Sequence, residues 1–428
     1  MTTLNRKIQP NFKKIDEINI AKAISGKLQN NIPIHYINDG TQDVVRIDFV
    51  FRAGDWYSKN SLVSASTNAI INEGSKNFSA FKIAENIDFY GAYVSLAVDS
   101  DNANISLFCL TKNLEKVIPV VEDFIKNPTY SQKEFENYIR KQKNNFITNS
   151  SKVKVLARRK LQETMFGKEH PYSNFIEIAD FDNLKVELLR DFHKKMYSAS
   201  NCEIMMAGRV TNSVIEIVDK HFGKNDWLGE KIDETSSKII KPYSEKIIKI
   251  EKADAVQNAI RIGKATISQT HDDFMKLQVL NTVLGGYFGS RLMSNIREDK
   301  GYTYGIGSML HSYRNEGMFA IVSEVGAEVC EKAVNEIYFE LNRLCQEQIP
   351  EQELDLVRNF MLGDFVRMFD GPFAILDSFK AIHKFNLDYE YYNTFIETIK
   401  TVSSTELMEI AQKYFNIESL FEVTVGKK

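Results

Sequence analysis

The sequence predicts an α+β fold built from two similar, duplicated domains, each with helices packed on one face of an antiparallel sheet. Apolar and polar residues alternate in Arg46–Arg52 and Ala92–Asp99, as they do in half-buried strands. Amphipathic helical spacing occurs in separate runs, for example over Ser403–Phe415. A doubly wound parallel sheet is less favoured, because the chain lacks a regular strand–helix alternation with Gly-rich turns.

The duplication rests on a pattern that recurs after about 216 residues. In the first half, the strand-like segment Ile105–Leu110 precedes the helical segment Asn113–Gln142. In the second half, Gly317–Val325 precedes Val329–Met361 in the same way. Both helical segments run from a Glu-Lys pair through an apolar-periodic helix and a turn with proline to an acidic helix start. Self-similarity at this length indicates duplicated domains rather than a solenoid of short repeats.

We therefore predict a first domain over residues 1–223, a linker over 224–252 and a second domain over 253–428. The linker is charged and polar, and it has little helical periodicity until it becomes strand-like at Ile247–Ile250.

Composition excludes several classes of protein. A net charge of −3 over 428 residues lacks the excess of positive charge that binding to nucleic acid requires. No run approaches the roughly 18 apolar residues of a membrane span, and the first residues do not resemble a secretory signal, so we predict a cytoplasmic location. Four scattered cysteines without a Cys-x-x-Cys pair predict free thiols in a reducing compartment. They are Cys109, Cys202, Cys330 and Cys345.

The segment Thr270–Tyr304 predicts two helices followed by a strand. The N-cap of the first helix is expected at Thr270 or His271, and a pair of glycines ends that helix. Ser290 is the expected cap of a second, short helix, and a strand begins at Tyr302.

Arg297 and Tyr304 lie seven residues apart across this helix–strand corner. A guanidinium and a phenol that project from one corner can both donate hydrogen bonds to the backbone carbonyls of an extended peptide. The chemistry alone leaves an alternative open, in which Arg297 makes a surface ion pair and Tyr304 packs in a core.

The segment Ser290–Tyr304 (SRLMSNIREDKGYTY) resembles the substrate-binding signature of the insulinase/pitrilysin family of zinc peptidases, the inverzincins. Phe166–Tyr172 (FGKEHPY) and Leu189–Val210 resemble other elements of that family, so the resemblance covers most of the chain. It implies one half of a peptidase like the mitochondrial processing peptidase. It also implies that Arg297 and Tyr304 bind the main chain of a substrate opposite a zinc ion.

The zinc motif of that family is missing. Active members carry His-x-x-Glu-His nine residues before a glycine that corresponds to Gly74, which places the degenerate zinc-site positions at Ala65, Asn68 and Ala69. A methyl group cannot bind zinc, and a carboxamide cannot act as a general base for water. The third ligand in the family is a glutamate roughly 75 residues later, and Lys143–Phe146 offers no carboxylate there.

No two histidines lie within five residues of each other, so the sequence contains no contiguous His-x-x-x-His site. We interpret each as a packing or surface residue, and a metal site assembled from distant histidines stays open. The seven are His35, His170, His193, His221, His271, His311 and His383.

The resemblance thus implies a non-catalytic subunit, with no catalytic residue and no cofactor of its own, that holds peptide near the zinc of a partner. The partner would be a homologue with His-x-x-Glu-His, peptidase activity would require the pair, and the peptide would also pair with a strand of the partner. The alternative is a catalytically inert structural or peptide-binding scaffold. An autonomous zinc peptidase is the least favoured function.

Overall fold

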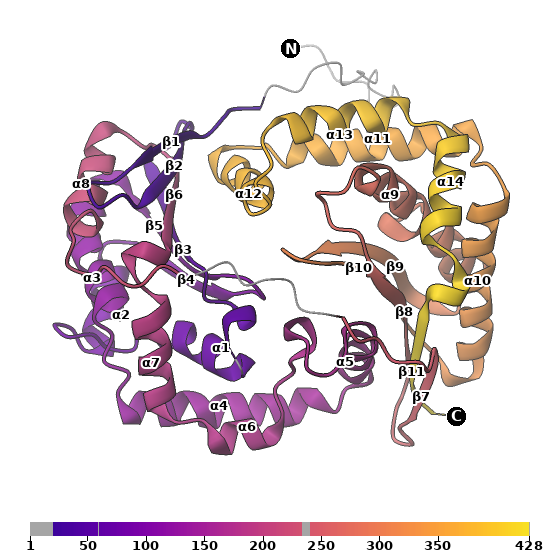
Figure 1. Cartoon of the computed structure of the whole chain (residues 1–428), viewed down its shortest axis with the longest axis horizontal. Coiled ribbons are helices and arrows are strands. Elements are labelled where there is room, and N and C mark those ends of the chain that lie inside the picture. Colours follow the sequence, from indigo (N-terminus) through magenta and orange to yellow (C-terminus); the bar gives the residue numbers. More distant parts are fainter. Residues whose placement is uncertain (1–19, 59, 233–239, 428) are drawn as a thin grey trace, which may run out of the picture.

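The computed structural model describes residues 20–58, 60–232 and 240–427. Two sheets face each other, and each has helices of its own half on its outer side (Figure 1). The first sheet has the order β1-β2-β6-β3-β5-β4 and the second the order β7-β11-β8-β10-β9. The strands are β1 (Ile24–Lys27), β2 (Pro33–Asn38), β3 (Val44–Phe51), β4 (Tyr93–Val98), β5 (Ala103–Leu110), β6 (Cys202–Gly208), β7 (Ile247–Glu251), β8 (Asn258–Thr266), β9 (Thr303–Ser312), β10 (Gly317–Val325) and β11 (Phe421–Gly426).

The α-helices follow the same division. Those of the first half are α1 (Ser61–Ala69), α2 (Ala80–Phe89), α3 (Leu114–Lys126), α4 (Gln132–Ser150), α5 (Val153–Phe166), α6 (Ile178–Asn183), α7 (Val186–Met196) and α8 (Asn212–Phe222). Those of the second half are α9 (Phe274–Asn281), α10 (Cys330–Gln346), α11 (Glu351–Arg367), α12 (Pro372–His383), α13 (Glu390–Thr401) and α14 (Ser404–Tyr414).

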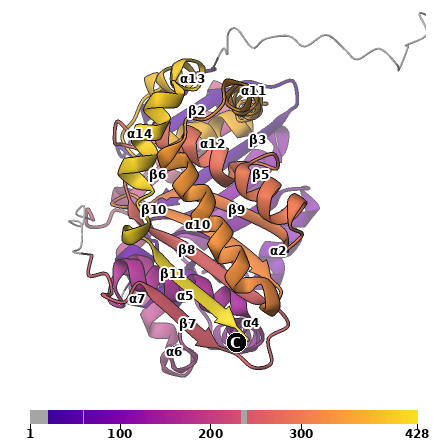
Figure 2. The same cartoon turned by 90° about the vertical axis from the view of Figure 1, so that its right-hand side faces the viewer.

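Apart from the additional edge strand β1 of the first sheet, the two sheets share one topology, which confirms the predicted duplication. Strand β6 lies parallel to β2 and antiparallel to β3, and β11 lies in the same way between β7 and β8. Each sheet continues through two further antiparallel strands, and Figure 2 shows the second sheet behind α10 and α14. The sheets are therefore mixed rather than purely antiparallel, because the last strand of each half lies parallel to an early strand of that half, β6 to β2 and β11 to β7. Alternation within a strand does not reveal this direction.

Strand β3 shows how the pattern positions its residues. Val45, Ile47 and Phe49 point into the core of the first half and are fully buried. The residues between them, Arg46 and Asp48, point to the inner face of the sheet, which faces the other half.

One helix of each half packs on the sheet of the other half. Helix α5 lies against β8 and β11, and α12 lies against β2 and β6 (Figure 1). These two helices occupy corresponding positions in the duplicated order, so the exchange is reciprocal. The α5 contact buries Ala157, Leu161, Met165 and Phe166 with Ile248, Ala259, Ala320, Phe421, Val423 and Val425. The α12 contact buries Ile375, Leu376 and Phe379 with Ile37, Met205 and Ala207.

Buried charges also hold α12 in place. Asp48, which is fully buried, accepts hydrogen bonds from Arg46 Nε at 2.9 Å and from Lys380 Nζ on α12 at 2.8 Å. Arg46 reaches Asp377 on α12 at 2.8 Å. Burial alone would raise the pKa of Asp48, but the charges and hydrogen bonds of Lys380 and Arg46 outweigh it and lower that pKa.

The linker is partly described. Strand β7 confirms the strand-like character of Ile247–Ile250, whereas residues 233–239 and the N-terminal residues 1–19 lie outside the described part of the chain. The predicted domain limits stay a prediction. Among the described helices, none combines the length and the apolar character that crossing a membrane requires.

We expect Leu161→Ala to lower the free energy of unfolding by about 2–4 kcal/mol, because it leaves a cavity between α5 and the second sheet. Urea unfolding followed by circular dichroism measures the change. Leu188→Ala, at a half-exposed position on α7, is the matched control and should change stability far less. Equal effects of the two substitutions would contradict the importance of the exchanged helix.

The lowered pKa of Asp48 predicts a dependence of stability on pH. The folded chain holds Asp48 ionised below the ordinary pKa of about 3.9, so the unfolded chain takes up this proton first as pH falls. The stabilisation is present above about pH 4–5 and is lost below it. Asp48→Asn should cost about 3–5 kcal/mol at pH 7 and should flatten the acid limb of a stability–pH profile. The surface variant Asp191→Asn should leave the profile unchanged. An acid limb in Asp48→Asn that is as steep as that of the unmodified chain would contradict the assignment.

Candidate functional site

The segment that carries Arg297 and Tyr304 is built from two π-helices. Helix α9 begins after Asp273 and continues as a π-helix over Thr282–Gly286. A second π-helix spans Met293–Asp299, and the chain then turns at a glycine with positive φ into β9. The predicted N-cap at Thr270 or His271 is wrong. π-Helices are rare and occur frequently at functional sites.

The predicted cap at Ser290 is also wrong, because its side chain does not bind a backbone N–H group in the described part of the chain. The hydroxyl of Ser290 is buried and finds no hydrogen-bond partner among the described residues. The neighbouring Arg291 is buried as well, and it forms a bidentate pair with Glu353 at 2.8 and 3.0 Å. Arg291 therefore fixes this segment to α11.

Arg297 behaves differently from Arg291. Its guanidinium lies 4.6 Å from the ring centre of Phe288, which is itself exposed. Within the described part of the chain, Arg297 has no ion-pair partner. Stacking on a ring orients the guanidinium and leaves its N–H donors free for a ligand.

Tyr304 stands near the start of β9, and 94% of its surface is exposed. Strand β9 is an edge strand of the second sheet, so one of its sides presents unpaired backbone groups. The core position that the alternative requires for Tyr304, and the ion pair that it requires for Arg297, are both missing from the described structure. The substrate-binding function of the two residues stays a prediction.

The degenerate zinc-site positions lie on α1, in the other half. Ala65 and Ala69 are half-buried, one helical turn apart. Asn68 is buried, and its amide donates hydrogen bonds to the carbonyls of Ala97 at 3.1 Å and Asn104 at 3.3 Å. Its side-chain oxygen accepts one from the Tyr197 hydroxyl at 3.1 Å. The amide therefore joins α1 to β4, β5 and α7.

The window of the third ligand offers no acid in the structure either. Lys143 on α4 makes an ion pair with Asp182. The four cysteines are free, as predicted. His170 Nδ1 accepts a hydrogen bond from the backbone N–H of Tyr172 and so caps a short turn. His193 is buried, and its Nε2 lies 2.9 Å from the carbonyl oxygen of Ile125.

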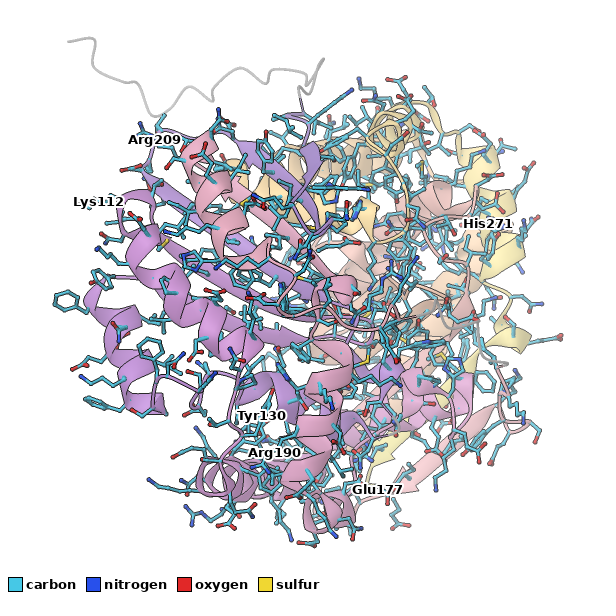
Figure 3. The ribbon with its side chains drawn as sticks, turned by 60° about the vertical axis from the view of Figure 1, so that its left-hand side comes forward. Lys112, Tyr130, Glu177, Arg190, Arg209 and His271 are labelled. Carbon is cyan, nitrogen blue, oxygen red and sulfur yellow. The ribbon has the colours of Figure 1, made fainter. Side chains whose placement is uncertain are left out.

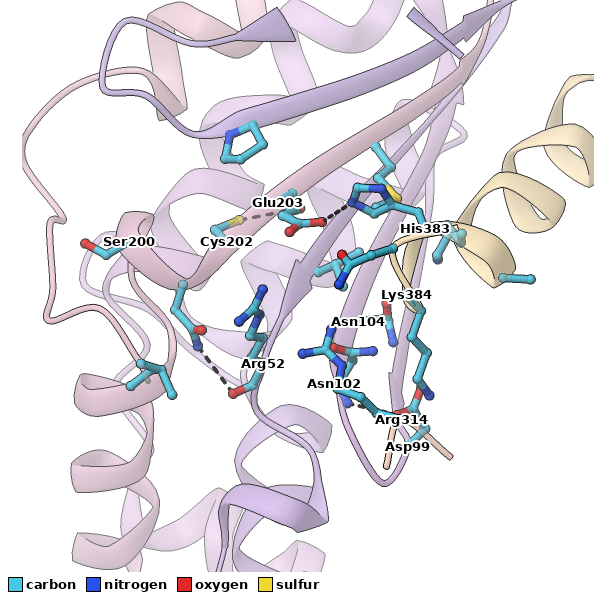
Figure 4. Close-up of a pocket in the computed structure, with 18 of the residues that line it drawn as sticks. Arg52, Asp99, Asn102, Asn104, Ser200, Cys202, Glu203, Arg314, His383 and Lys384 are labelled. Carbon is cyan, nitrogen blue, oxygen red and sulfur yellow. Dashed lines mark hydrogen bonds and ion pairs between the residues drawn. The ribbon is translucent and has the colours of Figure 1, made fainter. Parts of the chain in front are cut away.

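A third cluster lies between the first sheet and α12. A cavity of about 490 Å³ is lined by Arg52, Asn104, Glu203, Arg314 and His383, among others (Figure 4). His383 Nε2 lies 3.0 Å from a Glu203 oxygen, and the ring centres of His383 and His35 are 4.5 Å apart.

The electrostatics of this cluster favour a neutral His35 near an ionised Glu203. Burial, and next the charge of His383, lower the pKa of His35 to about 4. Burial alone would raise the pKa of Glu203, but its hydrogen bond to His383 and the charges of His383, His35 and Arg52 together lower it. Sequence reasoning missed this cluster, because no motif connects residues so far apart.

The structure combines two α+β halves that face each other. The first half has a helix without zinc ligands, and the second has the Arg297/Tyr304 corner. This combination defines the architecture of a degenerate zinc peptidase. The family description "Peptidase M16 inactive domain" matches residues 183–361. A solved structure described as the peptidase M16 inactive domain from Pseudomonas fluorescens superposes with a TM-score of 0.84 at 21% identity, over 95% of this chain and 98% of that one.

Curated relatives carry both active and inactive descriptions. The "Uncharacterized zinc protease YmxG" of Bacillus subtilis is 26% identical over 69% of this chain and 71% of its own length. The "Non-peptidase homolog YmxG" of Helicobacter pylori is 21% identical over 94% of this chain and 93% of its own. The "Mitochondrial-processing peptidase subunit alpha-1" of Dictyostelium discoideum is 32% identical over 35% of this chain and 23% of its own.

The chain is thus similar to the M16 peptidase inactive domain over residues 183–361, and it shares the fold of such a protein over nearly its whole length. The resemblance inferred from Ser290–Tyr304 is thereby confirmed.

The bonds of Asn68 predict that restoring the family's glutamate damages the fold. In Asn68→Glu, a carboxylate would face two carbonyl oxygens that now accept hydrogen bonds, at an expected cost of about 3 kcal/mol or more. Thermal unfolding measures the loss, and Asn137→Glu, on the exposed face of α4, is the control. An unfolding temperature that Asn68→Glu leaves unchanged would show that these bonds contribute nothing.

Proposed function

We propose that this chain is a non-catalytic subunit that binds an extended peptide at the Arg297/Tyr304 corner and presents it to a zinc-bearing partner. The partner would be a homologue with an intact His-x-x-Glu-His motif, which would supply the zinc and the catalytic base. The pair would act as a peptidase in the cytoplasm, and the chain alone would not.

The observation that carries the proposal is the contrast between Arg291 and Arg297. Six residues apart in one segment, Arg291 is buried in a carboxylate pair and Arg297 is held on an exposed ring without a counter-ion among the described residues. The described partner of Arg297 is the ring of Phe288, and Tyr304 is almost fully exposed. Both groups are available to donate hydrogen bonds to a peptide.

The edge position of β9 supports the same function. An extended peptide placed beside Tyr304 can add its backbone to the open side of an edge strand, which provides affinity without sequence selectivity. Holding the scissile bond in a fixed position near a metal-bound water is a catalytic contribution that requires no catalytic residue in this chain.

The scaffold alternative is favoured by Asn68. Asn68 stands where active family members have the catalytic glutamate, and its hydrogen bonds fasten α1 to neighbouring elements. A purely structural protein would use this position in the same way. A scaffold would need neither a partner with zinc nor a free Arg297.

Purification of the tagged full chain from native extract separates these two functions. Co-purification of a similar-sized homologue with His-x-x-Glu-His, in equal amount, supports the subunit. Recovery of this chain with partners that all lack that motif supports the scaffold and contradicts our proposal.

In the purified pair, Arg297→Ala should lower kcat/KM on a peptide library about tenfold to a hundredfold, because hydrogen bonds from a charged donor contribute about 1.5–3 kcal/mol. Tyr304→Phe should lower it by less, since it removes a neutral hydroxyl. Assembly, followed by size-exclusion chromatography, should not change. Arg209→Ala and Tyr93→Phe, at exposed positions of the first half, are matched controls. Full activity in both test variants would end the peptide-binding proposal.

A further inference from the structure

The cluster between the first sheet and α12 contains three metal-ligating side chains from three separate elements. His35 comes from β2, Glu203 from β6 and His383 from the end of α12. One ligand atom of each lies within 4.8 Å of the other two, and no other such group of three occurs among the described residues. Two are on the first sheet, and the third arrives with the exchanged helix.

We propose that His35, Glu203 and His383 bind a divalent transition-metal ion, best matched by Zn²⁺, which fastens α12 to the first sheet. Two imidazoles and one carboxylate form a donor set that zinc uses with an open fourth position. The site is separate from the family's zinc motif on α1, and it goes beyond the proposed peptide-binding function.

The orientation of His35 supports the site. Its Nδ1 lies 2.8 Å from the hydroxyl of Ser25, a contact of the kind that fixes the tautomer and ring angle of metal-binding histidines. No described residue forms a hydrogen bond with Nε2, which is left as the nitrogen for a metal. The Glu203–His383 pair alone does not explain why a second imidazole is buried against it.

The spacing of the ligands is compatible with metal binding. Zinc bonds of about 2.0–2.2 Å place tetrahedral ligand atoms about 3.3–3.6 Å apart. The three ligand atoms lie within 4.8 Å of one another, so metal binding requires each distance between them to shorten by at most about 1.5 Å. Side-chain rotation supplies such a shift while the backbone of β2, β6 and α12 stays in place.

The surroundings supply the fourth position. Glu203 and His383 line the 490 Å³ cavity together with Arg52 (Figure 4). Lys380 lines the same cavity. A water molecule or a small anion from this cavity can complete the coordination, and the basic side chains favour an anion. A site with this open position binds more weakly than a closed structural zinc site and exchanges its fourth ligand.

The binding experiment uses the full chain without a histidine tag. After chelator treatment and addition of Zn²⁺, mass spectrometry of the desalted protein should find one zinc per chain. Bound zinc should raise the unfolding temperature by about 3–6 °C, because it binds only the folded state. Mg²⁺, which prefers oxygen ligands, should have no effect.

Three variants locate the site. His35→Gln, Glu203→Gln and His383→Gln should each weaken zinc binding at least about tenfold and abolish the rise in unfolding temperature. The control His271→Gln, on the outer surface of the second half (Figure 3), should retain both, as should Arg297→Ala, which tests the separate peptide corner. Unchanged binding in all three variants, or no zinc retained by the unmodified chain, would overturn the proposal.

A second measurement does not depend on the folding of any variant. Co²⁺ bound to the unmodified chain should show the intense visible absorption of a four- or five-coordinate ion, and Zn²⁺ should displace it. A weak, six-coordinate spectrum would mean adventitious surface binding and would contradict the assigned site.

Discussion

The reciprocal burial of α5 and α12 is the contact on which the rest of the structure depends. Each sheet has a core of its own on the outer side, but its inner side is covered by a helix that the other half supplies. The two halves therefore cannot separate without exposing both apolar surfaces. This constraint fixes the relative position of α1 in the first half and the Arg297/Tyr304 corner in the second.

Much of the fold could be predicted from the sequence, because periodicity is a local property. The strand predicted at Gly317–Val325 has the same limits in the structure, and the spacing between the duplicated helices is correct. The exchange of α5 and α12 could not be predicted, since an apolar helix face does not specify which sheet covers it. The π-helices could not be predicted for a related reason. Serine is a residue type that commonly caps helices, but packing buries the hydroxyl of Ser290.

The residues of the candidate sites also divide into those that the sequence could identify and those that only the structure brings together. Arg297 and Tyr304 lie close in sequence, so a motif could identify them. Only the structure shows that Tyr304 is exposed and that Arg297 stacks on Phe288 without an ion-pair partner among the described residues. His35 and His383 are separated by most of the chain and meet solely because α12 crosses to the first sheet. On α1, Asn68 contributes hydrogen bonds to packing at the position that the resemblance aligns with the catalytic base of the family.

The exchange has a consequence for synthesis on the ribosome. Helix α5 ends at Phe166, and the first residue of its main partner strand, β8, is Asn258, about 92 residues later. Translation adds roughly 5–20 residues per second, so the apolar face of α5 stays uncovered for about 5–18 s before that strand is made. The inner face of the first sheet waits still longer, for α12 near the end of the chain. The nascent polypeptide therefore exposes two apolar surfaces for seconds. This exposure makes it a natural client for chaperones that shield such surfaces during translation.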